Sequence, residues 1–251
     1  AHLLVPVSIR DEGGMANLVS VARAFGRQIT REFEIDHEDR LGSLAEDFTE
    51  YPINPDLENT RGDYLVHWTR ATNGPWPDER QIDFYKDVLD SNGWPRSGLE
   101  TLRRMVGQRR IIASFRHMPA GVATVSFSSL PPAEVIPLMK WRARYRQMSF
   151  EPYGIGVSRG AAEGGGVRPV EYVESPDDPA GEEERWRCQT RGRGTDWRQE
   201  KEYRIRGGYT FDDIPPDQIV LYCKTPQEAD LLRRECPYRV IPLFTSCDKS
   251  T

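Results

Sequence analysis

The side chains best suited to chemistry lie in two strand-like stretches far apart in the chain. His67 and Thr69 stand two positions apart in one stretch, and Glu200, Glu202 and Arg204 occupy every second position of the other. Successive side chains of a strand point to opposite faces, so the members of each set share a face. Because two carboxylates on one face repel each other, at least one should have a cationic or hydrogen-bonding partner. The two sets are suited to form opposite walls of one polar cleft.

A third stretch adds two hydroxyl groups to the candidate site. Ser126 and Ser128 share one strand face, and Phe127 takes the other. Hydroxyls placed in this way can hydrogen-bond a neighbouring polar side chain or a ligand amide. Plainer interpretations stay open: hydroxyls that satisfy nearby backbone, a structural histidine, and a solvated edge strand in which Arg204 pairs with one glutamate.

The elements that must position these residues alternate irregularly between strands and helices. Strands are predicted at 3–9, 64–69, 111–115, 122–127, 153–158, 169–173, 200–205, 219–223 and 238–243. Helices are predicted at 15–31, 81–89, 98–106, 131–146 and 225–234. Short strands interspersed with helices favour an α+β fold over a doubly wound parallel sheet.

Composition and spacing suggest an N-terminal extension followed by one main domain. An acidic, turn-rich connection ends near Gly62, so we expect the extension over 1–61, with a strand and an amphipathic helix, and the main domain over 62–251. No apolar run approaches the roughly 18 residues of a membrane span, and we expect no membrane partner and a cytoplasmic location. The four cysteines form no C-x-x-C pair, and no metal site is expected.

The order of these motifs resembles the ADP-ribosyltransferase superfamily. A His-x-Thr strand, a Ser-Phe-Ser strand, a Tyr-Gly-Ile-Gly segment at 153–156 and a Glu-x-Glu strand follow one another along the chain. The resemblance covers roughly residues 62–243 and implies a split mixed or antiparallel sheet, with flanking helices, around a cleft for NAD. Phe127 replaces the middle threonine of the superfamily's Ser-Thr-Ser element, and residues 1–60 have no counterpart.

The resemblance also implies roles for individual NAD-binding residues. His67 would hold a ribose hydroxyl, and Thr69 would support the adenosine side. Ser126 and Ser128 correspond to the element beside the nicotinamide, and Tyr153 would stack on that ring.

The two glutamates would carry the reaction. Glu202 matches the superfamily's catalytic glutamate, and Glu200 stands where arginine-modifying members have Glu or Gln. Cleavage of the bond between nicotinamide and ribose passes through an oxocarbenium-like state, which a nearby carboxylate stabilises. NAD would be a substrate, and this chemistry requires no metal.

A closer likeness is to bacterial defence proteins of the abortive-infection type. Their segments resemble 150–157, 168–173 and 200–204, and DarT-type toxins share the early His-x-Thr. We therefore expect an NAD-dependent ADP-ribosyltransferase that acts as a toxin or phage-defence effector. The alternative is a catalytically silent protein of the same fold that works as a binding or antitoxin module. A metal-dependent nuclease is disfavoured, since no acidic cluster with a suitably spaced lysine occurs.

The acceptor is indicated by basic residues, although the net charge of −5 argues against wholesale wrapping by nucleic acid. Arg191 and Arg193 belong to an arginine-rich loop before Glu202, and in the superfamily this loop touches the target. We therefore expect an acidic acceptor such as a nucleic acid. A protein acceptor, or a solvated loop that contacts no acceptor, remains an alternative interpretation. Four more basic residues at 140–146 alternate with aromatic ones, and only a subset could face one phosphate track on a helix.

Overall fold

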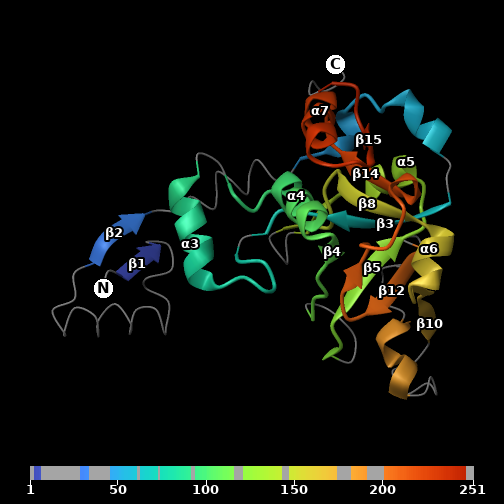
Figure 1. Cartoon of the computed structure of the whole chain (residues 1–251), viewed down its shortest axis with the longest axis horizontal. Coiled ribbons are helices and arrows are strands. Elements are labelled where there is room, and N and C mark those ends of the chain that lie inside the picture. The colour runs from blue at the N-terminus through green and yellow to red at the C-terminus, as the bar shows by residue number, and fades with distance from the viewer. Residues whose placement is uncertain are drawn as a thin grey trace.

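The computed structural model describes residues 3–6, 29–33, 46–60, 63–72, 74–91, 94–115, 121–142, 147–173, 182–190 and 201–246 (Figure 1). Within these ranges the protein is an α+β structure organised around one mixed sheet. The predicted α+β class with a mixed sheet is therefore confirmed.

Seven strands form the central sheet. Their order across it is β15 (Arg239–Pro242), β14 (Ile219–Cys223), β8 (Tyr153–Ser158), β3 (Tyr64–Thr69), β5 (Thr124–Ser128), β12 (Glu202–Arg206) and β9 (Arg168–Pro169). Only β14 and β15 run parallel; the other neighbouring pairs are antiparallel. The histidine, serine and glutamate strands thus lie next to one another.

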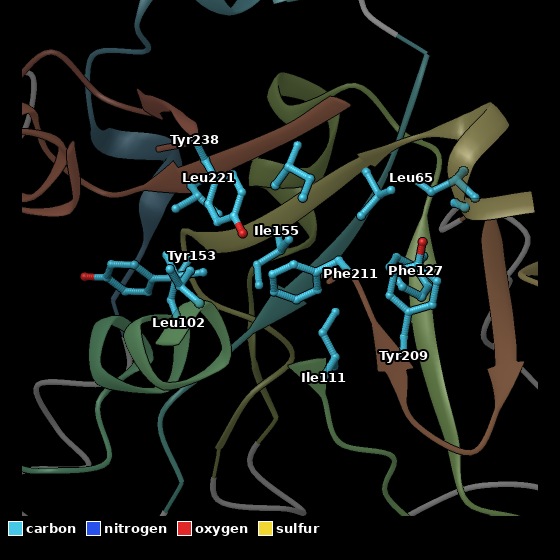
Figure 2. Packing of buried hydrophobic residues seen from close by; sticks show 14 of the residues in the cluster. Leu65, Leu102, Ile111, Phe127, Tyr153, Ile155, Tyr209, Phe211, Leu221 and Tyr238 are labelled. Atoms are coloured by element: carbon cyan, nitrogen blue, oxygen red, sulfur yellow. The ribbon is translucent and has the colours of Figure 1, made fainter. Parts of the chain in front are cut away.

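The two faces of the sheet carry separate hydrophobic cores, as the strand period of two requires. The first core holds Leu65, Ile155 and Leu221 of the sheet together with Leu102 of a covering helix (Figure 2). The second core takes the alternate positions of the same strands. It includes Val66, Trp68, Val220, Tyr222 and Ile241.

The described residues form five helices. They are α3 (Gln81–Asp90), α4 (Gly98–Gln108), α5 (Pro132–Val135), α6 (Arg159–Gly164) and α7 (Pro226–Glu235). Ser97 accepts from the Glu100 amide at the start of α4, and Thr225 and Glu228 form a capping box at the start of α7. Figure 1 shows α7 beside β14 and β15. The helices predicted at 81–89, 98–106 and 225–234 are therefore confirmed.

Short strands and turns complete the described structure. The strand pairs are β1 (Leu3–Pro6) with β2 (Ile29–Phe33), β10 (Glu171–Val173) with β11 (Cys188–Thr190), β13 (Tyr209–Thr210) with β4 (Arg110–Ile111), and β6 (Trp141–Arg142) with β7 (Gln147–Met148). The 3-10 turns are η2 (Phe48–Glu50), η3 (Pro55–Thr60), η5 (Ile136–Leu138), η7 (Glu182–Arg187) and η9 (Pro216–Gln218). No helix in the described ranges is long and apolar enough to cross a bilayer.

The expected boundary at 61 would place residues 46–60 in the N-terminal extension, but they pack with the main sheet. Phe48, Tyr51 and Leu57 belong to the second core. Ile53 forms an isolated bridge with Phe244, beyond the last strand. The part of the chain that could form a separate extension is therefore shorter than 61 residues.

Two predicted helices differ from the structure. The helix expected over 131–146 ends at Val135, because Pro137 lacks the amide that a continuing helix needs, and the chain goes on as η5 and β6. The helix expected over 15–31 conflicts with β2 at its end, since Ile29–Phe33 is a strand. Residues 15–28 lie outside the described residues.

Close packing explains the two glycines of the Tyr-Gly-Ile-Gly motif in β8. A Cβ atom at Gly154 would lie 2.9 Å from the Trp68 ring, and one at Gly156 would lie 2.7 Å from Val220. Both neighbours belong to the second core. The glycines therefore let large side chains of β3 and β14 cross over β8.

Candidate functional site

A cavity opens where the sheet splits between β3 and β5. These strands share one register pair, Val66 with Ser128, whereas β3 and β8 share six. Beside the split lies a cavity of about 520 Å³, whose lining includes residues of both cores, such as Phe127 of the first and Trp68 of the second. Its volume is within the usual range for small-molecule sites. His67, Ser126, Ser128 and Glu202 all line it, so residues separated by up to 135 positions meet there.

His67 presents a hydrogen-bond acceptor at this cavity. Its Nδ1 lies 2.7 Å from the backbone carbonyl oxygen of Ser126. A carbonyl can only accept, so Nδ1 carries the proton and Nε2 of the neutral ring keeps its lone pair. Burial lowers the pKa of His67 to about 4, the positive charge of Arg70 acts in the same direction, and the Ser126 bond opposes both. The imidazole is therefore neutral at physiological pH and can accept from a ligand hydroxyl.

Glu202 is held by a serine on the neighbouring strand and an arginine on its own. In the β12–β5 register Glu202 faces Ser128 and Arg204 faces Ser126, so all four side chains share one face of the sheet. The Ser126 hydroxyl donates to Glu202 Oε1 at 2.6 Å. Arg204 donates to both carboxylate oxygens, at 2.8 and 2.9 Å. The carboxylate is thus fixed in position and paired with a cation.

Arg204 is itself buried and held from the segment before β12. It is only 3% exposed. Its Nη2 donates to Gln189 Oε1 at 2.9 Å, and its Nη1 donates to the backbone carbonyl of Trp186. Arg204 thereby links Glu202 to the η7–β11 segment. The sequence of this region has no periodicity and predicted a loop or a frayed helix.

The residue before Glu202 adopts an uncommon backbone conformation. Lys201 has φ of 43°, in the left-handed region that favours glycine. Its carbonyl accepts from the backbone amide of Ser129 at 3.2 Å. The start of β12 is therefore anchored to the segment that follows β5, next to the cavity.

Three predicted NAD-binding residues occupy different surroundings. Ser128 lines the cavity, and its hydroxyl accepts from the Leu130 amide at 3.2 Å. Thr69 is buried and lies outside the cavity lining. Tyr153 packs in the first core near Leu102 (Figure 2), and its hydroxyl donates to Glu228 at 2.9 Å. The structure brings His67, Ser126, Ser128 and Glu202 together, but not Thr69 or Tyr153.

The remaining predicted site residues lie outside the described part of the chain. These are Glu200, Arg191 and Arg193. Conversely, the cavity lining includes Arg70 and Gln189, to which the sequence assigned no role, and Arg142, which was considered only among the basic residues at 140–146 as a possible phosphate contact. Arg70 directly follows the His-x-Thr strand, which was the available signal for it. Gln189 carries no comparable signal.

No protein family, curated protein or solved structure matches the chain. In the described ranges, histidine, cysteine and carboxylate side chains form no group of three that could hold a metal ion. The lining instead combines a neutral imidazole bonded to the Ser126 backbone with an ion-paired carboxylate bonded to the Ser126 hydroxyl. Such a set can bind hydroxyl groups and stabilise positive charge that develops near the carboxylate.

Proposed function

We propose that the protein binds NAD in this cavity and transfers ADP-ribose to an acceptor, as a bacterial toxin or phage-defence effector. The observation that carries the proposal is the meeting of His67, Ser126 and Glu202 at the split between β3 and β5. The resemblance to the ADP-ribosyltransferases assigned these three residues to an NAD site. Their convergence on one cavity is a separate observation, and it supports the resemblance.

Each group has a chemical task in this proposal. Nε2 of His67 accepts a hydrogen bond from a ribose hydroxyl, which orients the sugar. The bond between C1′ and the nicotinamide nitrogen breaks, and nicotinamide leaves with the electron pair. Glu202 stabilises the positive charge that remains on the ribose. An oxygen or nitrogen nucleophile then bonds to C1′ and releases its proton. Ser126 and Arg204 keep the carboxylate in place.

The acceptor in this proposal is acidic. Arg191 and Arg193, in the loop before Glu202, support a nucleic acid rather than a protein side chain. Neutralising both should flatten the salt dependence of modification without weakening NAD binding.

A second candidate is a catalytically silent binding module of the same fold. The observation that favours it is the grip of Arg204 on both oxygens of Glu202. A carboxylate that is already paired offers less charge to a developing cation than an unpaired one would. The two candidates share the cavity and differ in whether NAD is consumed.

The deciding experiment uses NAD labelled in its adenine moiety. The full chain is incubated with this NAD and mixed DNA, RNA and protein acceptors, and the labelled pools are separated. The enzyme proposal expects label in one acceptor pool or as free ADP-ribose, and the labelled acceptor pool identifies the target class. Full recovery of intact NAD, with saturable NAD binding, would establish the silent module instead.

A further inference from the structure

Two residues other than glycine have a positive φ in the described part of the chain. They are Arg109, with φ of 50°, and Lys201, with φ of 43°. The left-handed region costs an L-residue free energy, so such a conformation persists only where the surrounding structure holds it. Arg109 caps the C-terminal end of α4, where left-handed residues are common. Lys201 instead lies directly before β12 and next to Glu202 in the sequence.

The backbone of Lys201 is held by the segment that follows β5. Its carbonyl oxygen accepts from the Ser129 amide at 3.2 Å and from the Ser129 hydroxyl at 3.3 Å. The register of β12 with β5 begins at the next residue, where Glu202 pairs with Ser128. Because φ of Lys201 is a rotation of the chain just before this pair, it sets the direction in which the chain enters the strand.

The side chain of Lys201 is separate from the cavity. It is exposed, and Lys201 is not among the residues that line the cavity. Glu202 does line it, and its Oε1 accepts from the Ser126 hydroxyl at 2.6 Å and from Arg204 at 2.8 Å. A rotation of the strand end would lengthen these bonds and move the carboxylate. An effect of Lys201 on Glu202 therefore has to pass through the backbone.

We propose that Lys201 is a positioning residue for Glu202, and that its left-handed backbone, not its ammonium group, has this role. Glu202 is the first residue of β12, and the end of a strand opens more easily than its middle. The bonds from Ser129 hold Lys201 in the conformation that keeps the carboxylate beside Ser126. A misplacement of about 1 Å can lower a reaction rate a hundredfold. The inference rests on the proposed function in taking Glu202 as the group that stabilises charge on the ribose.

The test compares valine with asparagine at position 201 of the full chain. Valine is β-branched and disfavours a positive φ, whereas asparagine tolerates it, and neither carries the lysine charge. Lys201→Val should lower the kcat of NAD cleavage by roughly tenfold or more with little change in KM, because the carboxylate is misplaced while the rest of the cavity stays. Lys201→Asn should rescue most of this loss.

Arg109 supplies the matched control for backbone strain. Its carbonyl also accepts from a backbone amide, that of Phe211 at 3.1 Å, and it lies outside the cavity lining. Both Arg109→Val and Arg109→Asn lose the ion pair with Asp212, so their difference reports the backbone alone. At either position the valine variant should melt about 3 °C below the asparagine variant. Only at position 201 should valine also lower kcat.

Amide hydrogen exchange gives a second readout that needs no NAD chemistry. The Ser129 amide should lose protection in Lys201→Val and keep it in Lys201→Asn, because its acceptor is the carbonyl of residue 201. This pattern in a protein that leaves NAD intact would support the hold on β12 and refute only the proposed enzyme.

Three results would overturn the inference while the proposed function stands. They are a wild-type kcat in Lys201→Val, an equal loss of kcat in Arg109→Val, and a loss in Lys201→Asn as large as that in Lys201→Val. The last would assign the effect to the ammonium group. Unchanged protection of the Ser129 amide in Lys201→Val would overturn it whether or not NAD is cleaved.

Discussion

Two buried arginines in this protein are held by carboxylates in different ways. Arg96 is 1% exposed and donates to Glu79 and Asp87, and its guanidinium lies 3.8 Å from the centre of the Trp76 ring. Arg204 is 3% exposed and donates to Glu202. The partners of Arg96 all come from residues 76–95 and lie outside the cavity lining. Those of Arg204 come from η7, β11 and β12, and two of them, Gln189 and Glu202, line the cavity.

The comparison shows that burial of an ion pair does not by itself mark a site. Around Arg96, Glu79 also accepts from the Trp76 amide at 3.0 Å, so the network fixes the loop before α3 against α3 and α4. Around Arg204, the paired carboxylate borders an open volume that a ligand could enter. The neighbouring cavity, and not the pair, distinguishes the candidate site from the scaffold.

The largest expected effect comes from removing the scaffold arginine. Arg96→Met should lower the free energy of unfolding by about 4 kcal/mol, because it leaves the mostly buried Glu79 without its cation. NAD affinity of the folded fraction should stay unchanged. Chemical denaturation checks the first statement and calorimetry the second. The control Arg80→Met removes an exposed pair with Asp83 and should leave the transition in place. A tenfold loss of NAD affinity in Arg96→Met would show that Arg96 also supports the cavity, which would contradict its role as scaffold.

The buried carboxyl group of Glu151 should make stability depend on pH. Burial raises the pKa of Glu151 to about 7, and its carboxylate accepts from the Ala71 amide. The folded state holds a proton that the unfolded state has lost, so this contribution is complete below the ordinary pKa of glutamate and disappears as pH rises through 7. The loss should reach about 3 kcal/mol. Denaturation curves from pH 4 to 8 should show it, and Glu151→Gln should flatten it. An equal slope in both proteins would contradict the assignment.

A smaller effect is expected at Gln189, which we assign as a positioning residue for Arg204 and Glu202. Gln189→Ala removes a 2.9 Å bond to Arg204 and should cost about 1 kcal/mol of stability. The kcat for NAD cleavage should fall roughly tenfold with little change in KM, because the carboxylate is held less firmly. Gln218→Ala, which removes the 2.9 Å bond from Ser158, is the matched control outside the cavity. Equal losses of kcat in both variants would reduce Gln189 to a structural role.

The sequence predicted the strands of the central sheet well, because alternation on a two-sided sheet is a strong local signal. It also predicted that His67, Ser126 and Glu202 converge. Thr69 and Tyr153 were assigned by resemblance, but Tyr153 shares its strand face with Ile155 and Val157 and therefore packs in the first core. The two-residue spacing of Tyr153, Ile155 and Val157 could have predicted this placement from the sequence.

Other parts of the site could not be predicted from local patterns. Arg142 was expected on a helix, and Pro137 ends that helix so that residue 142 reaches the cavity on β6. Gln189 meets Arg204 only through tertiary packing of a segment without periodicity. The pairing of Arg204 with a glutamate was among the interpretations that the sequence left open. The burial of Arg204 was not predicted. Sequence patterns indicate which face a side chain takes, but not which distant segment covers it.

The central claim is tested most directly by nicotinamide release from NAD in wild type and Glu202→Gln. The variant also weakens a buried pair, with an expected stability loss of about 2 kcal/mol, so rates are compared at a temperature where both proteins are folded. Glu235→Gln, which breaks a pair with Arg103 away from the cavity, serves as the control. The account predicts a loss on the order of a hundredfold or more for Glu202→Gln and none for the control. Equal rates of release in wild type and Glu202→Gln would contradict it.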